Sequence, residues 1–192
     1  MVLRKLKNVS RHCYMLESAE DNQKWGRYTF LGYDPRLEVT CTNGKLTIKN
    51  GTSVTMETKH PGEYIRQILD ENKSPKIEGF PTFTGGLVGY FSYDYMKYAE
   101  PSLVLDAEDK EGFKDVDLML FDKVIAFDHF RQKIILIVNI RCEDLKTEYH
   151  RAELELSTMK QLIQNGEMAE EIPGRCTSEF RALFDQKQYC SM

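Results

Sequence analysis

The sequence of 192 residues lacks any apolar run of about 18 residues, which argues against a membrane-spanning helix. It has no excess of basic residues, because 26 lysines and arginines stand against 30 aspartates and glutamates, for a net charge of -4. A nucleic-acid-binding face needs clustered positive charge and is therefore not expected. The segment Met1–Lys7 has no apolar signal-peptide core, so we expect a cytoplasmic location.

Residues that usually carry chemistry are also scarce or badly spaced. The five cysteines are odd in number and contain no Cys-x-x-Cys spacing, so neither a disulfide framework nor a zinc site is expected. His12, His60, His129 and His150 are dispersed without metal-site spacing. The run Gly85–Gly89 lacks the Lys-Ser/Thr ending of a phosphate loop, and no Gly-x-Ser-x-Gly elbow occurs. We expect no catalytic residue, cofactor site or metal site in this chain.

Alternating apolar and polar residues predict antiparallel sheets. Strands are expected over 36–42, 45–49 and 52–57, joined by turns at Asn43-Gly44 and Asn50-Gly51. Further strands are expected over 12–18, 27–33, 84–93, 118–127 and 133–140, and helices over 1–9, 61–73 and 143–165. The predicted fold class is α+β, with sandwich-like antiparallel β-sheets and flanking helices.

Two finer expectations concern how strands and side chains are placed. The glycine-rich segment 84–93 is predicted to be a central strand pressed closely against neighbouring backbone. The aspartates of the later hairpin are predicted to face solvent, as a charged edge that discourages aggregation; they are Asp115, Asp117, Asp122 and Asp128.

The C-terminal part of the sequence differs from the rest. Residues 167–178 are expected to form a linker, and Asp185 is expected to cap a short helix beginning at Gln186. An isolated helix of that length is unstable in water, so we expect the chain to continue in a longer protein. We interpret 1–166 as one domain, lacking part of its N-terminal lead-in, and 167–192 as a linker and the start of another domain.

The most informative stretch combines charged, hydroxyl and aromatic side chains at the ends of two predicted strands. The carboxylate of Glu17 can accept hydrogen bonds from a ligand ammonium group, and the hydroxyl of Ser18 or the guanidinium of Arg27 can hold a ligand carboxylate. Tyr28 and Phe30 can form an aromatic wall for an apolar side chain. The structural alternative is a cross-strand ion pair between Glu17 and Arg27, with the aromatic rings filling the core.

Several motifs together resemble the N-terminal region of anthranilate synthase component I. They are Leu16-Glu17-Ser18-Ala19-Glu20, Lys24-Trp25-Gly26-Arg27-Tyr28-Thr29-Phe30-Leu31-Gly32, the segment 85–94, the hairpin around 121–138, and residues 180–192, which resemble the lead-in to the chorismate-binding domain. The resemblance implies that the feedback inhibitor L-tryptophan binds at Leu16, Glu17 and Ser18. It also implies that the strand containing Arg27, Tyr28, Thr29 and Phe30 lines the same pocket.

The resemblance implies further that the complete protein converts chorismate and ammonia to anthranilate and pyruvate. The ammonia would come from a glutamine amidotransferase partner, component II, and catalysis would use Mg2+ and a chorismate-binding domain outside this chain. The chain alone is then expected to be inactive. Two other classes stay open, namely the large subunit of aminodeoxychorismate synthase and a free-standing amino-acid-binding or interaction module.

Overall fold

The computed structural model describes residues 1–18, 26–100, 102–105, 108–170 and 173–192. A four-stranded antiparallel sheet contains, in spatial order, β1 (Cys13–Glu17), β2 (Tyr28–Tyr33), β8 (Lys123–Asp128) and β9 (Lys133–Val138). A five-stranded antiparallel sheet contains β5 (Thr52–Glu57), β4 (Lys45–Asn50), β3 (Leu37–Thr42), β7 (Val116–Phe121) and β6 (Gly86–Phe91). The helices are α1 (Val2–Val9), α2 (Pro61–Glu71), α3 (Leu145–Asn165), α4 (Gln186–Ser191) and the 3-10 helix η1 (Tyr93–Tyr98). This arrangement confirms the α+β class.

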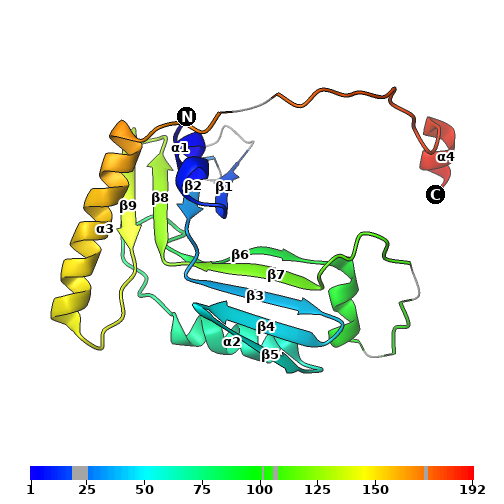
Figure 1. Cartoon of the computed structure of the whole chain (residues 1–192), viewed down its shortest axis with the longest axis horizontal. Coiled ribbons are helices and arrows are strands. Elements are labelled where there is room, and N and C mark those ends of the chain that lie inside the picture. The colour runs from blue at the N-terminus through cyan, green and yellow to red at the C-terminus, as the bar shows by residue number, and fades with distance from the viewer. Residues whose placement is uncertain (19–25, 101, 106–107, 171–172) are drawn as a thin grey trace.

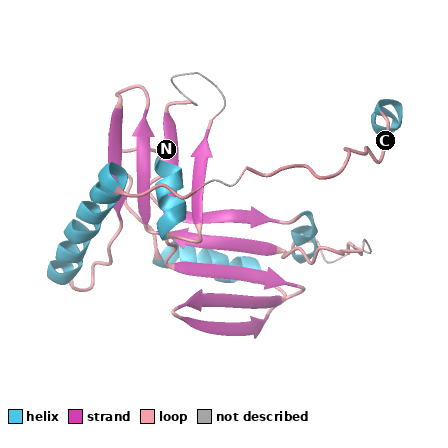
Figure 2. Cartoon of the chain, turned by 45° about the horizontal axis from the view of Figure 1, so that its top comes forward, coloured by secondary structure: helices cyan, strands magenta, loops and turns pink. Residues whose placement is uncertain are grey.

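The two sheets are set at an angle to each other and are joined where β7 leads into β8 (Figure 1). The same relation is visible in the rotated view, where the strands of the two sheets run in different directions (Figure 2). Helices α1 and α3 accompany the four-stranded sheet, whereas α2 lies along the five-stranded sheet. Each sheet therefore has its own helical cover and its own core.

The core of the four-stranded sheet forms on the face that α1 and α3 cover. Leu31 and Ile125 point to this face from neighbouring strands and are buried against Leu6 of α1 and Met159 of α3. The ammonium group of Lys5 donates to the carbonyl oxygens of Ile163 at 2.6 Å and Gln164 at 3.2 Å. Because the last carbonyls of a helix have no partner within it, this lysine ties α1 to the C-terminal end of α3.

The five-stranded sheet shows the alternation that the sequence predicts. Val39, Leu46 and Leu118 are buried on one face against Ile65 and Ile68 of α2. The turn between β3 and β4 has positive φ at both Asn43 (48°) and Gly44 (81°), as a two-residue hairpin of this kind requires. The predicted meander and the helix that begins at Pro61 are thereby confirmed.

One predicted strand is in fact two. The run 118–127 bends at Asp122, so that β7 joins the five-stranded sheet and β8 joins the four-stranded sheet. Asn139 stabilises the bend, because its backbone N–H donates to the carbonyl oxygen of Asp122 at 2.8 Å and its side-chain amide donates to the carbonyl of Thr84 at 2.7 Å. The periodicity of the run continues through the bend and therefore hides it.

The glycine-rich strand β6 is an edge strand, so the prediction of a central strand is wrong. Its only partner within the described residues is β7, and Tyr90 and Phe91 near its end are 41% and 49% exposed. The expected close backbone approach is confirmed at Gly89, whose φ is 154°, because an added Cβ would overlap the carbonyl oxygen of Asp117. Glycine at this position lets the backbone of β6 approach that of β7 closely. It does not indicate a strand that is buried on both faces.

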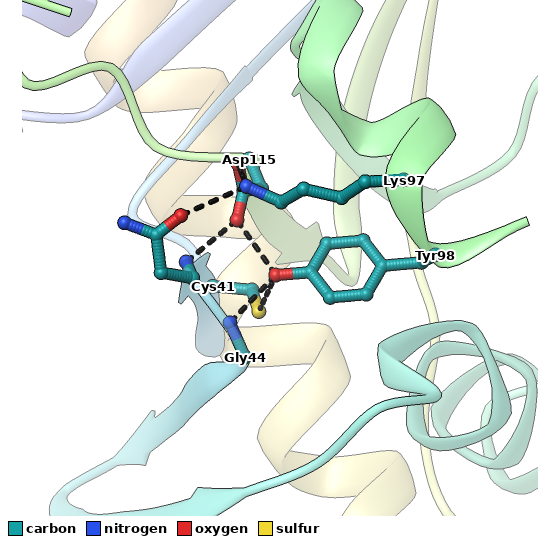
Figure 3. A network of polar contacts seen from close by, with 6 residues as sticks. Cys41, Gly44, Lys97, Tyr98 and Asp115 are labelled. Atoms are coloured by element: carbon teal, nitrogen blue, oxygen red, sulfur yellow. Dashed lines mark hydrogen bonds and ion pairs between the residues drawn. The ribbon is translucent and has the colours of Figure 1, made fainter. Parts of the chain in front are cut away.

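The prediction of solvent-facing aspartates is wrong for Asp115 and Asp128, which are 3% and 1% exposed. Figure 3 shows that Asp115 accepts hydrogen bonds from the ammonium of Lys97 at 2.8 Å and the hydroxyl of Tyr98 at 2.6 Å. The hydroxyl of Tyr98 in turn accepts from the backbone N–H of Gly44 at 2.6 Å. This network fastens η1 to the turn between β3 and β4.

The C-terminal helix α4 begins where the sequence predicts. The side chain of Asp185 accepts from the backbone N–H of Gln188 at 2.8 Å, and the side chain of Gln188 accepts from the backbone N–H of Asp185 at 3.0 Å. This reciprocal pair is a capping box. Figure 1 shows α4 at the end of an extended segment, away from both sheets. Among the described helices, none is long and apolar enough to cross a membrane.

Candidate functional site

The two motifs of the candidate ligand site lie on adjacent strands. Strands β1 and β2 pair antiparallel, with Leu16 opposite Phe30 and Glu17 opposite Thr29. Residues at the end of β1 and at the start of β2 therefore meet at one end of the four-stranded sheet. The remaining motif residues Ala19, Glu20, Lys24 and Trp25 fall in 19–25, outside the described part of the chain.

Strand alternation divides the candidate residues between the two faces of this sheet. Leu16, Tyr28 and Phe30 share one face, and Glu17 and Thr29 share the opposite face, which is the face of α1 and α3. The structure thus brings the candidate residues to one end of one sheet but separates an aromatic group from a polar group. A ligand that uses both groups has to lie across this end of the sheet.

The aromatic group continues beyond the residues that the motifs contain. The rings of Tyr28 and Phe30 are stacked, with centroids 5.6 Å apart, and Phe30 meets the ring of Phe83 edge-on at 5.6 Å. Tyr14 contacts Phe83 at 6.3 Å, and Leu16 at the margin of the group is 44% exposed. Phe83 lies in a loop far along the chain from β2, so no local pattern marked it as a neighbour.

Arg27 forms an ion pair with Asp128 at the end of β8, so the alternative pairing with Glu17 is wrong. Its Nε donates to Oδ1 of Asp128 at 3.0 Å and its Nη2 donates to Oδ2 at 2.7 Å. These bonds hold the pKa of the buried Asp128 carboxyl at about 2. The guanidinium also lies over the rings of Tyr28 at 4.8 Å and Phe130 at 5.7 Å. Two of its donors are therefore already used within the protein.

The polar group contains a histidine, His129, that is not among the predicted ligand-binding residues. The Thr29 hydroxyl oxygen lies 3.2 Å from Glu17 Oε1 and 2.7 Å from Nε2 of His129. Thr29 is 5% exposed, whereas Glu17 and His129 are exposed. His129 follows β8 directly, so its place depends on the pairing of β2 with β8, which local sequence does not reveal. Ser18 is exposed at the end of the described segment that contains β1.

A separate cleft of about 640 Å³ lies between the two sheets and away from the candidate residues. Its lining includes Arg36, Lys73, Asp122, Asn139 and Arg141. Burial raises the pKa of the Asp122 carboxyl above its ordinary value. In the described part of the chain, no group of three or more His, Cys, Asp or Glu side chains could hold a metal ion.

The chain thus folds into two antiparallel sheets, with a candidate ligand site at the end of one of them. The chain belongs to the family of chorismate binding enzymes, whose model matches residues 11–192. Among curated proteins it is 37% identical over 168 residues to anthranilate synthase component 1 of Acinetobacter calcoaceticus, covering 84% of this chain and 33% of that protein. It is also 29% identical over 183 residues to aminodeoxychorismate synthase component 1 of Bacillus subtilis, covering 92% of this chain and 37% of that protein.

A solved structure shares the fold. The crystal structure of anthranilate synthase component I from Streptococcus pneumoniae matches with a TM-score of 0.53 and 24% sequence identity, over 79% of this chain and 32% of that chain. The chain spans about a third of the length of the curated relatives that it matches. The family model and the 37% identity to the Acinetobacter calcoaceticus protein together establish family membership.

Proposed function

We propose that this chain is the N-terminal, regulatory part of an anthranilate synthase component I subunit. The observation that carries the proposal is the pairing of the end of β1, with Leu16 and Glu17, and the start of β2, in a chain 37% identical to such a subunit. The complete subunit would act in the cytoplasm, in tryptophan biosynthesis. It would convert chorismate and ammonia to anthranilate and pyruvate, a lyase reaction. A glutamine amidotransferase, component II, would supply the ammonia.

In this proposal, L-tryptophan binds at the end of β1 and β2 and inhibits the enzyme. Glu17 accepts hydrogen bonds from the ligand ammonium group, and the Ser18 hydroxyl bonds the ligand carboxylate. Leu16, Tyr28 and Phe30 provide apolar and aromatic surface. Arg27 contributes mainly by holding β2 to Asp128, because that carboxylate already takes two of its donors.

Inhibition follows if the ligand binds one arrangement of the complete subunit more tightly than another. A ligand shifts such an equilibrium only by its difference in affinity for the two states. Tryptophan bound here would favour a low-activity arrangement of this part relative to the chorismate-binding domain, and the coupling would be reciprocal between the two sites. The sites would then communicate without sharing a residue.

The catalytic chemistry is assigned to the rest of the subunit. The donors that Mg2+ prefers are carboxylates and other oxygens, and the described residues gather no group of three side chains that could hold a metal ion. The proposal places Mg2+ binding and bond breaking in the chorismate-binding domain, as the resemblance implies. The chain alone is expected to show no turnover of chorismate.

The identity of the product tests the enzymatic part of the proposal. The complete subunit is incubated with chorismate, Mg2+, glutamine and component II, and the products are separated by chromatography. Anthranilate is the expected product. Accumulation of aminodeoxychorismate would contradict the proposal and favour the second candidate, since the Bacillus subtilis relative is an aminodeoxychorismate synthase component 1.

The inhibitor site is tested by Ser18→Phe in the complete subunit. The bulky ring would occupy the space of the ligand carboxylate, so a higher tryptophan concentration should be needed to halve the rate of each sample relative to its own uninhibited rate. Ser53→Phe, on the exposed face of β5, serves as the matched control and should leave inhibition unchanged. Equal inhibition of both variants by tryptophan would show that Ser18 is not part of the inhibitor site.

A free-standing binding module is the remaining alternative. Calorimetric titration of the 192-residue chain with L-tryptophan distinguishes it, because the proposal expects weak or undetectable binding without the rest of the subunit. Tight binding by the chain alone would instead favour the module.

A further inference from the structure

Three side chains from separate segments meet at the proposed tryptophan site. Glu17 ends β1, Thr29 lies in β2, and His129 follows β8. The hydroxyl oxygen of Thr29 is 3.2 Å from Oε1 of Glu17 and 2.7 Å from Nε2 of His129. The ligand-binding residues that the resemblance implies include Glu17 and Thr29 but not His129, which lies in the hairpin around 121–138.

The chemistry of the three groups fixes the direction of these hydrogen bonds. A carboxylate only accepts hydrogen bonds, and a hydroxyl has a single hydrogen to donate. Thr29 must therefore donate to Glu17, which leaves its oxygen to accept from a protonated Nε2 of His129. The result is one directed chain of hydrogen bonds, from His129 through Thr29 to Glu17.

The histidine end of this series of hydrogen bonds is firmly held. The backbone N–H of His129 donates to the carbonyl oxygen of Arg27 at 2.9 Å. The preceding residue, Asp128, is buried, accepts two hydrogen bonds from the Arg27 guanidinium and accepts a third from the backbone N–H of Arg131 at 3.1 Å. The turn that carries the imidazole is thus fastened to the start of β2.

The glutamate end is the exposed one. Glu17 is exposed at the end of the edge strand β1, and Thr29 provides its one hydrogen bond in the described part of the chain. The Glu17 side chain has three rotatable bonds. Without the contact to Thr29, it would lose its conformational freedom only on binding the ligand. Holding one carboxylate oxygen before binding lowers that entropic cost and leaves the second oxygen for the ligand.

We propose that His129 is a positioning residue of the tryptophan site, acting through Thr29 to orient Glu17 towards the ligand ammonium group. This inference rests on the proposed function, because it deepens the role given there to Glu17. His129 itself does not contact the ligand. Because Glu17 contacts the ligand ammonium group, replacing His129 should weaken the binding only of ligands that carry such a group.

The test uses the complete subunit and two ligands, L-tryptophan and indole-3-propionate, which lacks the amino group. The donor-removing variants are His129→Leu and Thr29→Val, and their matched controls are His129→Gln and Thr29→Ser, which keep a donor at each position. Dissociation constants for both ligands are measured by calorimetry. Circular dichroism of each variant records whether it is folded.

The donor-removing variants should bind L-tryptophan about fivefold more weakly, the effect of one hydrogen bond, while indole-3-propionate binds as it does to the wild type. Each control should restore the wild-type ratio of the two constants. A loss of affinity shared equally by both ligands would overturn the positioning role, because it would mark a general structural effect. Unchanged ratios in both donor-removing variants would overturn it as well.

Binding of L-tryptophan to the wild-type subunit distinguishes a failure of the proposed function from a failure of the role of His129. If the wild-type complete subunit binds no L-tryptophan, the site assignment is wrong and the positioning role falls with it. If the wild type binds L-tryptophan but the variants show no ligand-selective loss, the site assignment stands and only the role of His129 is refuted.

Discussion

Replacing Asp128 by asparagine removes one charge from the ion pair that holds β2 to the end of β8. In the wild type, Oδ1 of Asp128 accepts from Arg27 Nε at 3.0 Å and from the Arg131 N–H at 3.1 Å, and Oδ2 accepts from Arg27 Nη2 at 2.7 Å. An asparagine can keep its oxygen at the first position. Its amide nitrogen then faces Nη2 of Arg27, so that two donors oppose each other.

The cost of Asp128→Asn follows from these contacts. One charge-assisted hydrogen bond is lost at a side chain with 0% exposure, while Arg27 at 27% exposure regains some hydration. We therefore expect a loss of about 2 kcal/mol in the free energy of unfolding, within the usual range for hydrogen bonds to charged groups. For a chain of this size, the melting temperature should fall by roughly 4–8 °C.

Thermal unfolding followed by circular dichroism measures this effect. The matched control is Glu38→Gln, which breaks the exposed pair with Lys49 at 3.0 Å and should cost less than about 1 kcal/mol. If Asp128→Asn and Glu38→Gln lower the melting temperature equally, the buried ion pair does not stabilise the end of the sheet. The reasoning about Arg27 as a structural residue would then be wrong.

Three further predictions concern the pH dependence of Asp128 and the contacts of Gly89 and Tyr98. The pKa of Asp128 is lowered from 3.8 to about 2, so its stabilisation is present above pH 3.8 and is lost as the pH falls towards 2; urea unfolding should show this loss in the wild type but not in Asp128→Asn. Gly89→Ala should lower the urea midpoint, because its Cβ would overlap the backbone of β7. Tyr98→Phe deprives the buried Asp115 of a donor and should cost about 1–3 kcal/mol by chemical denaturation, whereas Tyr93→Phe at an exposed ring should cost almost nothing.

Local signals were sufficient to predict the hairpins and most helices. The turn at Asn43 and Gly44 needs positive φ at both residues, and an Asn-Gly pair is the usual sequence for this. The capping residue Asp185 likewise acts on a backbone group three residues away. Features whose cause lies within a few residues of their effect are visible in a single sequence.

Features that depend on distant partners could not be predicted. The bend between β7 and β8 is stabilised by Asn139, whose partner Asp122 is 17 residues away. The ion pair of Arg27 with Asp128 spans 101 residues, and the contact of Thr29 with His129 spans 100 residues. Strand periodicity shows which residues share a face but not which strands are neighbours, so the buried aspartates and His129 could not be placed in advance.

The sequence predicted two strands, one for each motif, and the structure shows them as the paired strands β1 and β2. Their register was not predicted; the structure places Glu17 opposite Thr29 on the adjacent strand. Strand alternation alone could have separated this pair from Leu16 and Phe30 on the other face. The partner of Arg27 could not have been found in this way, because it lies on β8.

The most direct test of the central claim is a calorimetric titration of the complete subunit with L-tryptophan, for the wild type and for Glu17→Gln. The account predicts saturable binding to the wild type and roughly tenfold weaker binding to Glu17→Gln, because the substitution removes a charged acceptor for the ligand ammonium group. Binding of equal strength to both proteins would contradict the claim that the end of β1 and β2 is the tryptophan site.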